Sequence, residues 1–243
     1  MENLKEEIIR FREEFWLFDI DIKNAVEVYH RFIRPSRNVT VVWDDSEGEV
    51  KAIIEAQDQK ALWRLKTKFK TVFSSWIITP DNLSLEADFY HLLKRKKWAV
   101  ATAESVTGGM IAARILNVPG ASDILSESYI VYSNEKKISV LGVDPEVIDR
   151  FGVLSWETAM AMVEKLAEKS KVQVAISTTG IAGPAGGSEE QPVGTIYFGF
   201  IVGAAREAIK KQFKGSRNAI RKQATAFALG KVIQLCQEGR DNR

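Results

Sequence analysis

The first third of the chain alternates between helical and strand-like spacing of its hydrophobic residues. Leu4, Ile8, Phe11 and Phe15 recur at helical spacing and predict a helix from Leu4 to Phe18. The pattern that follows predicts a helix, two strands, a helix and a third strand, at residues 25–33, 39–43, 50–56, 57–70 and 72–78. These elements predict a small α/β domain over residues 1–82.

From residue 83 onward, strand-like and helical stretches alternate. Helices are expected at residues 85–97, 107–117, 135–141, 145–150, 156–169 and 216–237, with Ser216 as the N-cap of the last one. Strands are expected at residues 98–103, 124–132, 172–178, 193–202 and 206–213, the last two forming a hairpin. The alternation predicts a layered α/β domain over residues 83–243, with a mixed, mainly parallel sheet and flanking helices.

Composition excludes several classes of site. The 243 residues are 45% hydrophobic and 27% charged, as in an ordinary globular protein. The single Cys236 excludes an internal disulfide and an all-cysteine zinc site. His30 and His91 are the only histidines and both precede the motifs described below, so neither a Ser-His-Asp triad nor a polyhistidine metal site is expected. We expect no metal and no cofactor.

Charge and hydropathy also bear on partners and location. The N-terminus is acidic, unlike a signal peptide, and no apolar run is long enough to cross a bilayer. We therefore expect a cytoplasmic protein with no membrane partner. The net charge of +2 gives no general reason to expect a nucleic-acid partner.

One local segment is basic with interleaved aromatic residues. Residues 60–70 hold five cations together with Trp63 and Phe69, a pattern that can mark RNA contact. The same residues form an amphipathic helix if Leu62, Leu65 and Phe69 face inward and the cations face water. We favour the amphipathic helix and expect no nucleic-acid binding.

The first motif that could carry chemistry is Ala-Glu-Ser-Val-Thr-Gly-Gly, at residues 103–109. Ser105 follows a predicted strand and precedes a predicted helix, the position at which open α/β sheets bind ligands. The backbone N–H groups of Thr107, Gly108 and Gly109 are candidates to hold an anion at the helix start. The alternative is a simple helix start with Ser105 as its N-cap.

The second motif, Tyr-Ser-Asn-Glu-Lys-Lys at residues 132–137, spans a strand-to-helix turn. Where no histidine serves as the base, a buried lysine with a lowered pKa can take the proton of a serine nucleophile, directly or through a tyrosine. Tyr132 and a following lysine fit that scheme, but the spacing does not choose between Lys136 and Lys137. A solvated helix start is the alternative.

The third motif is a loop at residues 179–187, which has four glycines after a buried strand. It matches neither the dinucleotide nor the nucleoside-triphosphate fingerprint. We expect it to contact a ligand, because ordering such a loop is entropically costly; a plain connector is the alternative. Farther on, Arg217 and Arg221 lie one helical turn apart, and either could hold a phosphate or simply face solvent.

These motifs resemble the C-terminal domain of the CinA (competence/damage-inducible protein) family, the nicotinamide-nucleotide amidases, from about residue 83 to 235. The family's Ala-Glu-Ser-Cys-Thr-Gly-Gly stands here with Val106 in place of cysteine, and its Tyr-Ser-Asn-Glu-x-Lys stands at residues 132–137. Its Thr-Gly-Ile-Ala-Gly-Pro and Gly-Gly-Ser-Glu-Glu-x-Pro-Val-Gly-Thr stand at residues 179–184 and 186–195.

The resemblance implies hydrolysis of the carboxamide of nicotinamide mononucleotide to nicotinate mononucleotide and ammonia. It implies Ser105, Tyr132 and Lys137 as the catalytic group, Thr179 as a contact of the reacting amide, and Arg217 or Arg221 as the phosphate ligand. Gly180, Ala182 and Gly183 would line the substrate site. A homodimer is also expected.

Besides Val106, a second segment departs from the family. Ser126-Glu127-Ser128 stands where the family usually has Gly-Gly, and these side chains would narrow the pocket. This favours, as the alternative function, a catalytically inactive nucleotide-binding or interaction protein of the same fold. Residues 1–82 are similar to the family's KH-like linker domain but lack a GxxG loop, and no counterpart of its molybdopterin-binding-like domain is visible.

Overall fold

The computed structural model describes residues 11–34, 38–46, 48–78 and 83–238. The chain divides into two compact units, Met1–Ser84 and Leu85–Arg243, and each is described by itself.

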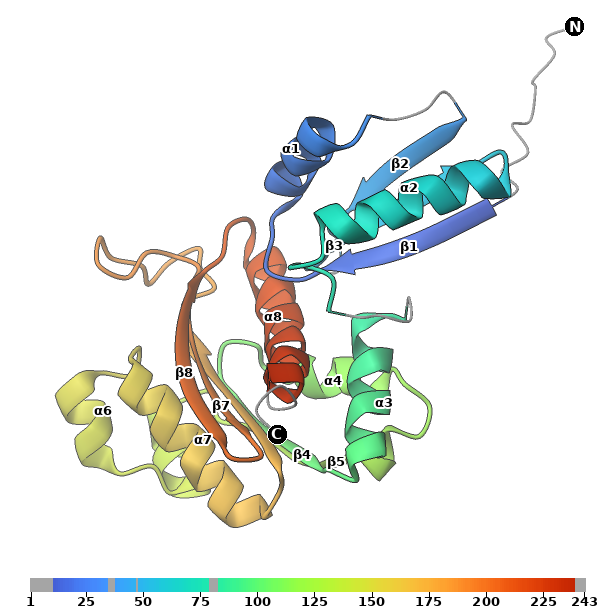
Figure 1. The fold of residues 1–243 in the computed structure, drawn as a ribbon. Coiled ribbons are helices and arrows are strands. Elements are labelled where there is room, and N and C mark those ends of the chain that lie inside the picture. Colours follow the sequence, from blue (N-terminus) through green and yellow to red (C-terminus); the bar gives the residue numbers. More distant parts are fainter. Residues whose placement is uncertain (1–10, 35–37, 47, 79–82, 239–243) are drawn as a thin grey trace, which may run out of the picture. The chain divides into compact units, whose positions relative to one another are not determined.

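The first unit packs two helices on a three-stranded antiparallel sheet (Figure 1). Its elements are β1 (Phe11–Leu17), α1 (Ile22–Phe32), β2 (Val39–Asp44), β3 (Val50–Ala56) and α2 (Gln59–Val72). The strand order is β1-β3-β2. Asp21 and Asp58 cap the two helices through their side chains, which accept the N–H groups of Asn24 and Ala61.

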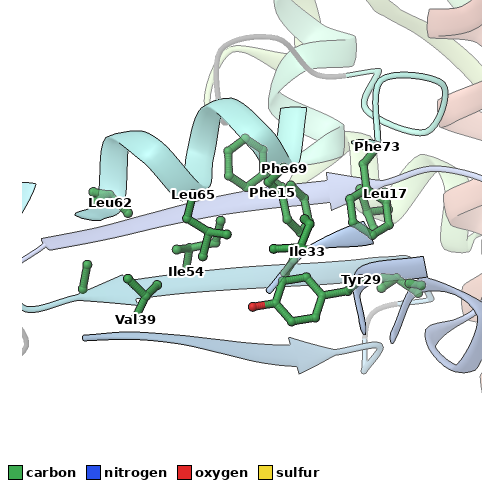
Figure 2. Packing of buried hydrophobic residues seen from close by; sticks show 14 residues of the cluster. Phe15, Leu17, Tyr29, Ile33, Val39, Ile54, Leu62, Leu65, Phe69 and Phe73 are labelled. Carbon is green, nitrogen blue, oxygen red and sulfur yellow. The ribbon is translucent and has the colours of Figure 1, made fainter. Parts of the chain in front are cut away.

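Aromatic rings fill the core of this unit (Figure 2). Phe69 of α2 stacks on Phe15 of β1 and on Phe73, at centroid distances of 5.0 and 4.4 Å. Leu62, Leu65 and Phe69 are buried, which confirms that α2 is amphipathic.

Two predicted elements of this unit are wrong. The predicted helix from Leu4 to Phe18 is strand β1 over Phe11–Leu17, and its first part lies outside the described residues. The predicted strand at residues 72–78 is absent, because α2 continues to Val72 and the chain then turns. Only a single bridge, between Ile77 and Leu17, remains of it.

The second unit is built on a five-stranded mixed sheet in the order β5-β4-β6-β7-β8. Its strands are β4 (Val100–Glu104), β5 (Leu125–Ile130), β6 (Val174–Gly180), β7 (Thr195–Val202) and β8 (Ala205–Gln212). β4 pairs in parallel with β5 and β6, whereas β7 is antiparallel to both β6 and β8. β8 therefore runs in the direction of the parallel strands, which confirms the predicted sheet class.

Helices cover both faces of this sheet, with α7 on one face and α8 on the other (Figure 1). The α-helices are α3 (Leu85–Lys96), α4 (Met110–Leu116), α5 (Asn134–Lys136), α6 (Pro145–Phe151), α7 (Trp156–Ser170) and α8 (Arg217–Glu238). A 3-10 turn, η1 (Ala121–Asp123), precedes β5, and a π-helical turn, η2 (Lys137–Leu141), follows α5. α4 begins three residues later than predicted, because Gly108 and Gly109 have positive φ of 59° and 90°.

Within the described ranges, no helix combines the length and the hydrophobicity that a membrane span requires.

Candidate active site

Ser105 directly follows the carboxyl end of β4. This strand lies between β5 and β6 and is parallel to both. The backbone N–H of Ser105 donates to the carbonyl of Thr178 on β6, at 3.1 Å. This bond holds the residue at the edge of the sheet, where the chain turns toward α4. The side chain is largely buried, with 7% of the residue exposed.

Glu104, the residue before it, anchors the turn. Its buried carboxylate accepts the N–H groups of Gly109, Ile111 and Ala112 at 2.9, 3.1 and 3.0 Å. A carboxylate at the start of a helix satisfies N–H groups that have no partner within the helix. The Gly109 amide therefore already has an acceptor inside the chain.

Lys137 reaches Ser105 from the turn after β5. Its Nζ donates to Ser105 Oγ and to the Val131 carbonyl, both at 3.2 Å. The residue is 1% exposed, and burial lowers the pKa of its amine. Lys136, by contrast, is exposed and pairs with Glu135, so the lysine that reaches the serine is Lys137.

The π-helical turn η2 begins at Lys137 itself. Such turns interrupt the regular helical pattern and often occur at functional positions. Here the turn ends at Gly142, whose φ of 84° lets the chain leave toward α6.

A pocket of about 300 Å³ opens above these groups. Its lining includes eight of the twelve predicted site residues, namely Ser105, Tyr132, Lys137, Thr179, Gly180, Ala182, Gly183 and Arg217. The other lining residues are Val106, Asn134, Val153, Leu154, Ile181, Ala185 and Gly186. No histidine is among them, and the side chain that contacts Ser105 Oγ is the Lys137 amine.

Tyr132 lies in the pocket but away from the serine. Its hydroxyl accepts a hydrogen bond from Arg217 Nη2 at 3.2 Å, and the residue is 63% exposed. Among the residues that the structure describes, its hydroxyl forms no hydrogen bond with Ser105 or Lys137. Arg217 also donates from Nη1 to the Gly183 carbonyl at 2.7 Å, which joins α8 to the glycine-rich loop.

The two arginines of α8 have different surroundings. Arg221 does not line the pocket; its Nε and Nη2 donate to the carbonyls of Val106 and Thr107, at 3.1 and 2.8 Å. Arg217 is therefore the arginine that a pocket ligand can reach.

Three predicted binding residues, Thr107, Gly108 and Gly109, also lie outside the lining. The hydroxyl of Thr107 is fully buried, 2.9 Å from the hydroxyl of Thr178. These residues form the turn that follows the serine.

Thr179 lines the pocket from the end of β6, and its hydroxyl donates to the Val153 carbonyl at 2.9 Å. The segment Ser126-Glu127-Ser128 lies on the edge strand β5, and none of its residues is among the lining residues. Its side chains therefore do not narrow this pocket.

Asn134, Val153 and Leu154 are among the seven lining residues that the predicted site did not include. Asn134 stands inside the second motif, so its motif neighbours were a usable signal. Val153 and Leu154 precede α7 in a stretch without any motif, and only the fold brings them to the site.

No group of three or more His, Cys, Asp or Glu side chains suited to a metal occurs in the described part of the chain.

Comparison with known proteins shows the family of the chain. The family model described as the CinA C-terminal domain matches residues 82–236. The chain belongs to the CinA family. A CinA-like protein of Kosmotoga olearia is 38% identical over 211 residues, which cover 84% of this chain and 51% of that protein. A putative competence-damage inducible protein of Alkaliphilus oremlandii is 38% identical over 61% of this chain and 36% of that protein.

Solved structures agree with the CinA assignment. The competence/damage inducible protein CihA from Agrobacterium tumefaciens is 31% identical, with a TM-score of 0.58 over 62% of this chain and 93% of that one. A competence or damage-inducible protein from Enterobacter asburiae is 26% identical, with a TM-score of 0.60 over 63% of this chain and 96% of that one. The chain spans about half the length, or less, of the Kosmotoga and Alkaliphilus relatives.

Proposed function

We propose that this CinA-family chain hydrolyses the carboxamide of nicotinamide mononucleotide, with Ser105 as nucleophile and Lys137 as its base. The observation that carries the proposal is the 3.2 Å contact between Lys137 Nζ and Ser105 Oγ, two residues that line the same pocket. A serine hydroxyl is a weak nucleophile until a neighbouring base takes its proton. Lys137 suits that role because burial lowers the pKa of its amine, so the neutral form is accessible at lower pH.

The reaction then runs in two balanced steps. Ser105 Oγ attacks the carboxamide carbon while the neutral Lys137 amine takes the serine proton. Lys137 returns that proton to the departing nitrogen, which leaves as ammonia, and an ester on Ser105 remains. A water molecule attacks the ester, its proton passes through Lys137 to Ser105 Oγ, and nicotinate mononucleotide is released. One water is consumed for each ammonia formed.

Backbone N–H groups are suited to hold the oxyanion of both steps. Val106 follows the nucleophile and lines the pocket. Within the described ranges its N–H has no hydrogen-bond acceptor, so it is available to an oxyanion. A donor of this kind is typically worth a few kcal/mol in the transition state. We propose that Thr179, on the neighbouring strand, contacts the amide.

Substrate size and charge are consistent with a mononucleotide. A pocket of about 300 Å³ suits a small ligand, and Arg217 offers a guanidinium that can grip phosphate oxygens. Tyr132 was predicted to relay protons, but its bond to Arg217 supports a role in binding the substrate beside that arginine.

The test is ammonia release from nicotinamide mononucleotide by the purified chain. Ser105→Ala and Lys137→Met should each reduce turnover by about a thousandfold or more. Ser128→Ala removes an exposed serine of β5 outside the pocket and should leave turnover unchanged. Equal rates for wild type and Ser105→Ala would refute the mechanism. Binding of the nucleotide in calorimetry without turnover would instead establish the alternative, an inactive nucleotide-binding protein.

A further inference from the structure

Arg221 holds the backbone that follows the nucleophile. We call residues 105–109 the nucleophile loop. Two donors of one planar guanidinium, Nε and Nη2, bond the successive carbonyls of Val106 and Thr107 at 3.1 and 2.8 Å. Because the fork is rigid, it fixes both carbonyls relative to α8, which a single flexible ammonium could not do.

This contact determines where the amides of the loop point. In a planar trans peptide, the C=O and the following N–H point in opposite directions. Since the carbonyls of Val106 and Thr107 face Arg221, the N–H groups of Thr107 and Gly108 face away from it. Neither of these N–H groups, nor that of Val106, has an acceptor within the part of the chain that the structure describes. The loop thus keeps a run of unpaired donors beside Ser105.

Gly108 makes the close approach of the guanidinium possible. A Cβ at this position would lie 3.1 Å from Arg221 Nη2, and the residue has a positive φ of 59°. Both features favour glycine here.

A second charged group holds the other end of the loop. The Glu104 carboxylate accepts the N–H groups of Gly109, Ile111 and Ala112. A cation therefore holds two carbonyls of the loop, and an anion holds its last amide and two amides of α4. The amides of residues 106–108 have no acceptor in the described part of the chain.

We propose that Arg221 is a positioning residue for the nucleophile loop. It keeps Ser105 Oγ at Lys137 Nζ and keeps the N–H groups of residues 106–108 available for the oxyanion. Its effect on turnover rests on the proposed amidase function, whereas its effect on the order of the loop does not. A phosphate ligand, by contrast, would need a guanidinium that lines the pocket, and Arg221 does not.

The experiment compares Arg221→Gln, Arg221→Lys and Arg217→Gln in the full chain. Three measurements are made on each: kcat and KM for nicotinamide mononucleotide, the rate at which a sulfonyl fluoride modifies Ser105, and amide hydrogen exchange. For Arg221→Gln, kcat and the labelling rate should fall by about 10- to 100-fold, the cost of a misplaced reacting group, with KM within about twofold. Arg221→Lys should restore only part of the loss. Arg217→Gln should instead raise KM.

Hydrogen exchange supplies the readout that needs no substrate. Two hydrogen-bonded amides, that of Ser105 at the start of the loop and that of Met110 just after it, should exchange faster in Arg221→Gln, while those of β7 stay protected. If Arg221→Gln unfolds the domain, Arg221→Lys carries the comparison.

The outcomes separate the two proposals. Unchanged exchange and labelling in the Arg221 variants, or a change confined to KM, would overturn the positioning role. No ammonia from the wild type, together with exchange and labelling that respond to Arg221→Gln, would refute the substrate and leave the positioning role standing. If Ser105 of the wild type resists the reagent, the exchange measurement decides.

Discussion

Tyr132 and Arg217, 85 positions apart in the chain, are joined by a hydrogen bond of 3.2 Å from the guanidinium to the phenol oxygen. The tyrosine hydroxyl is therefore hydrogen-bonded to a residue of α8 and not to Ser105 or Lys137. This relationship separates two roles for Tyr132, proton relay and substrate contact, which predict different kinetics.

Tyr132→Phe is expected to raise KM about fivefold and to change kcat by less than about twofold. Losing the hydrogen bond of the tyrosine hydroxyl costs about 1 kcal/mol, which corresponds to about a fivefold loss of affinity. Steady-state kinetics with nicotinamide mononucleotide measure both constants. A fall in kcat of a hundredfold at unchanged KM would show that the hydroxyl relays protons after all.

Arg217→Ala is expected to weaken nicotinamide mononucleotide binding by about 10- to 100-fold, because a charge-assisted contact to phosphate is lost. Nicotinamide riboside, which has no phosphate, should bind the variant and the wild type equally well. Calorimetry with both compounds measures the preference. Lys214→Ala removes an exposed cation three residues earlier and serves as the control. An unchanged preference in Arg217→Ala would place the phosphate elsewhere.

Lys137 should make both stability and turnover depend on pH. Burial lowers the pKa of its amine below the ordinary 10.5, so between the folded and unfolded pKa values the unfolded state binds more protons. The Lys137 contribution to the free energy of unfolding should therefore rise with pH across that window and level off above about 10.5. Lys137→Met should lack this contribution and be more stable than the wild type below the window, where the wild type must bury an ammonium.

Urea denaturation of both proteins between pH 7 and pH 11 tests this difference. The kcat of the wild type should increase with pH as the amine loses its proton, up to the folded pKa. A stability difference that does not vary with pH would contradict a lowered pKa for Lys137.

Gly199 tests the packing of the sheet that carries the site. A Cβ on this β7 residue would lie 2.4 Å from the Ala159 carbonyl oxygen of α7 and 2.6 Å from Ser177 Oγ. Gly199→Ala should therefore cost about 3 kcal/mol, because the helix must move away from the sheet. Gly142→Ala meets no atom within 4 Å and should cost only about 1 kcal/mol, from its positive φ. Equal urea-unfolding midpoints for Gly199→Ala and Gly142→Ala would show that the sheet accommodates the methyl group.

The sequence predicted the second unit better than the first, and the reason is local. In residues 85–238 the helices and strands are separated by turns and glycines, so each periodic run has clear ends. Phe11 and Phe15, by contrast, fit a helical period as well as an alternating one. Pairing decides the matter, because Phe15 lies opposite Ala52 of β3, a partner distant in the sequence.

For the site, the motifs predicted which residues share the pocket but not what each one contacts. The choice of Lys137 over Lys136 came from the family motif, and the structure separates the two lysines by burial. The two arginines looked equivalent because they lie one turn apart on α8. Their different contacts are to backbone carbonyls more than thirty and more than one hundred positions away, which spacing cannot reveal.

The carboxylate of Glu104 has a consequence for how this pocket could change over evolutionary time. Many phosphate sites are built from backbone amides at a helix start, which no single substitution can remove. Here the amides at the start of α4 already donate hydrogen bonds to the Glu104 carboxylate. The cation of α8 that lines the pocket is the side chain of Arg217. Recognition of an anion by one side chain can be altered by one codon, so relatives with the same nucleophile loop could diverge in substrate without rebuilding the fold.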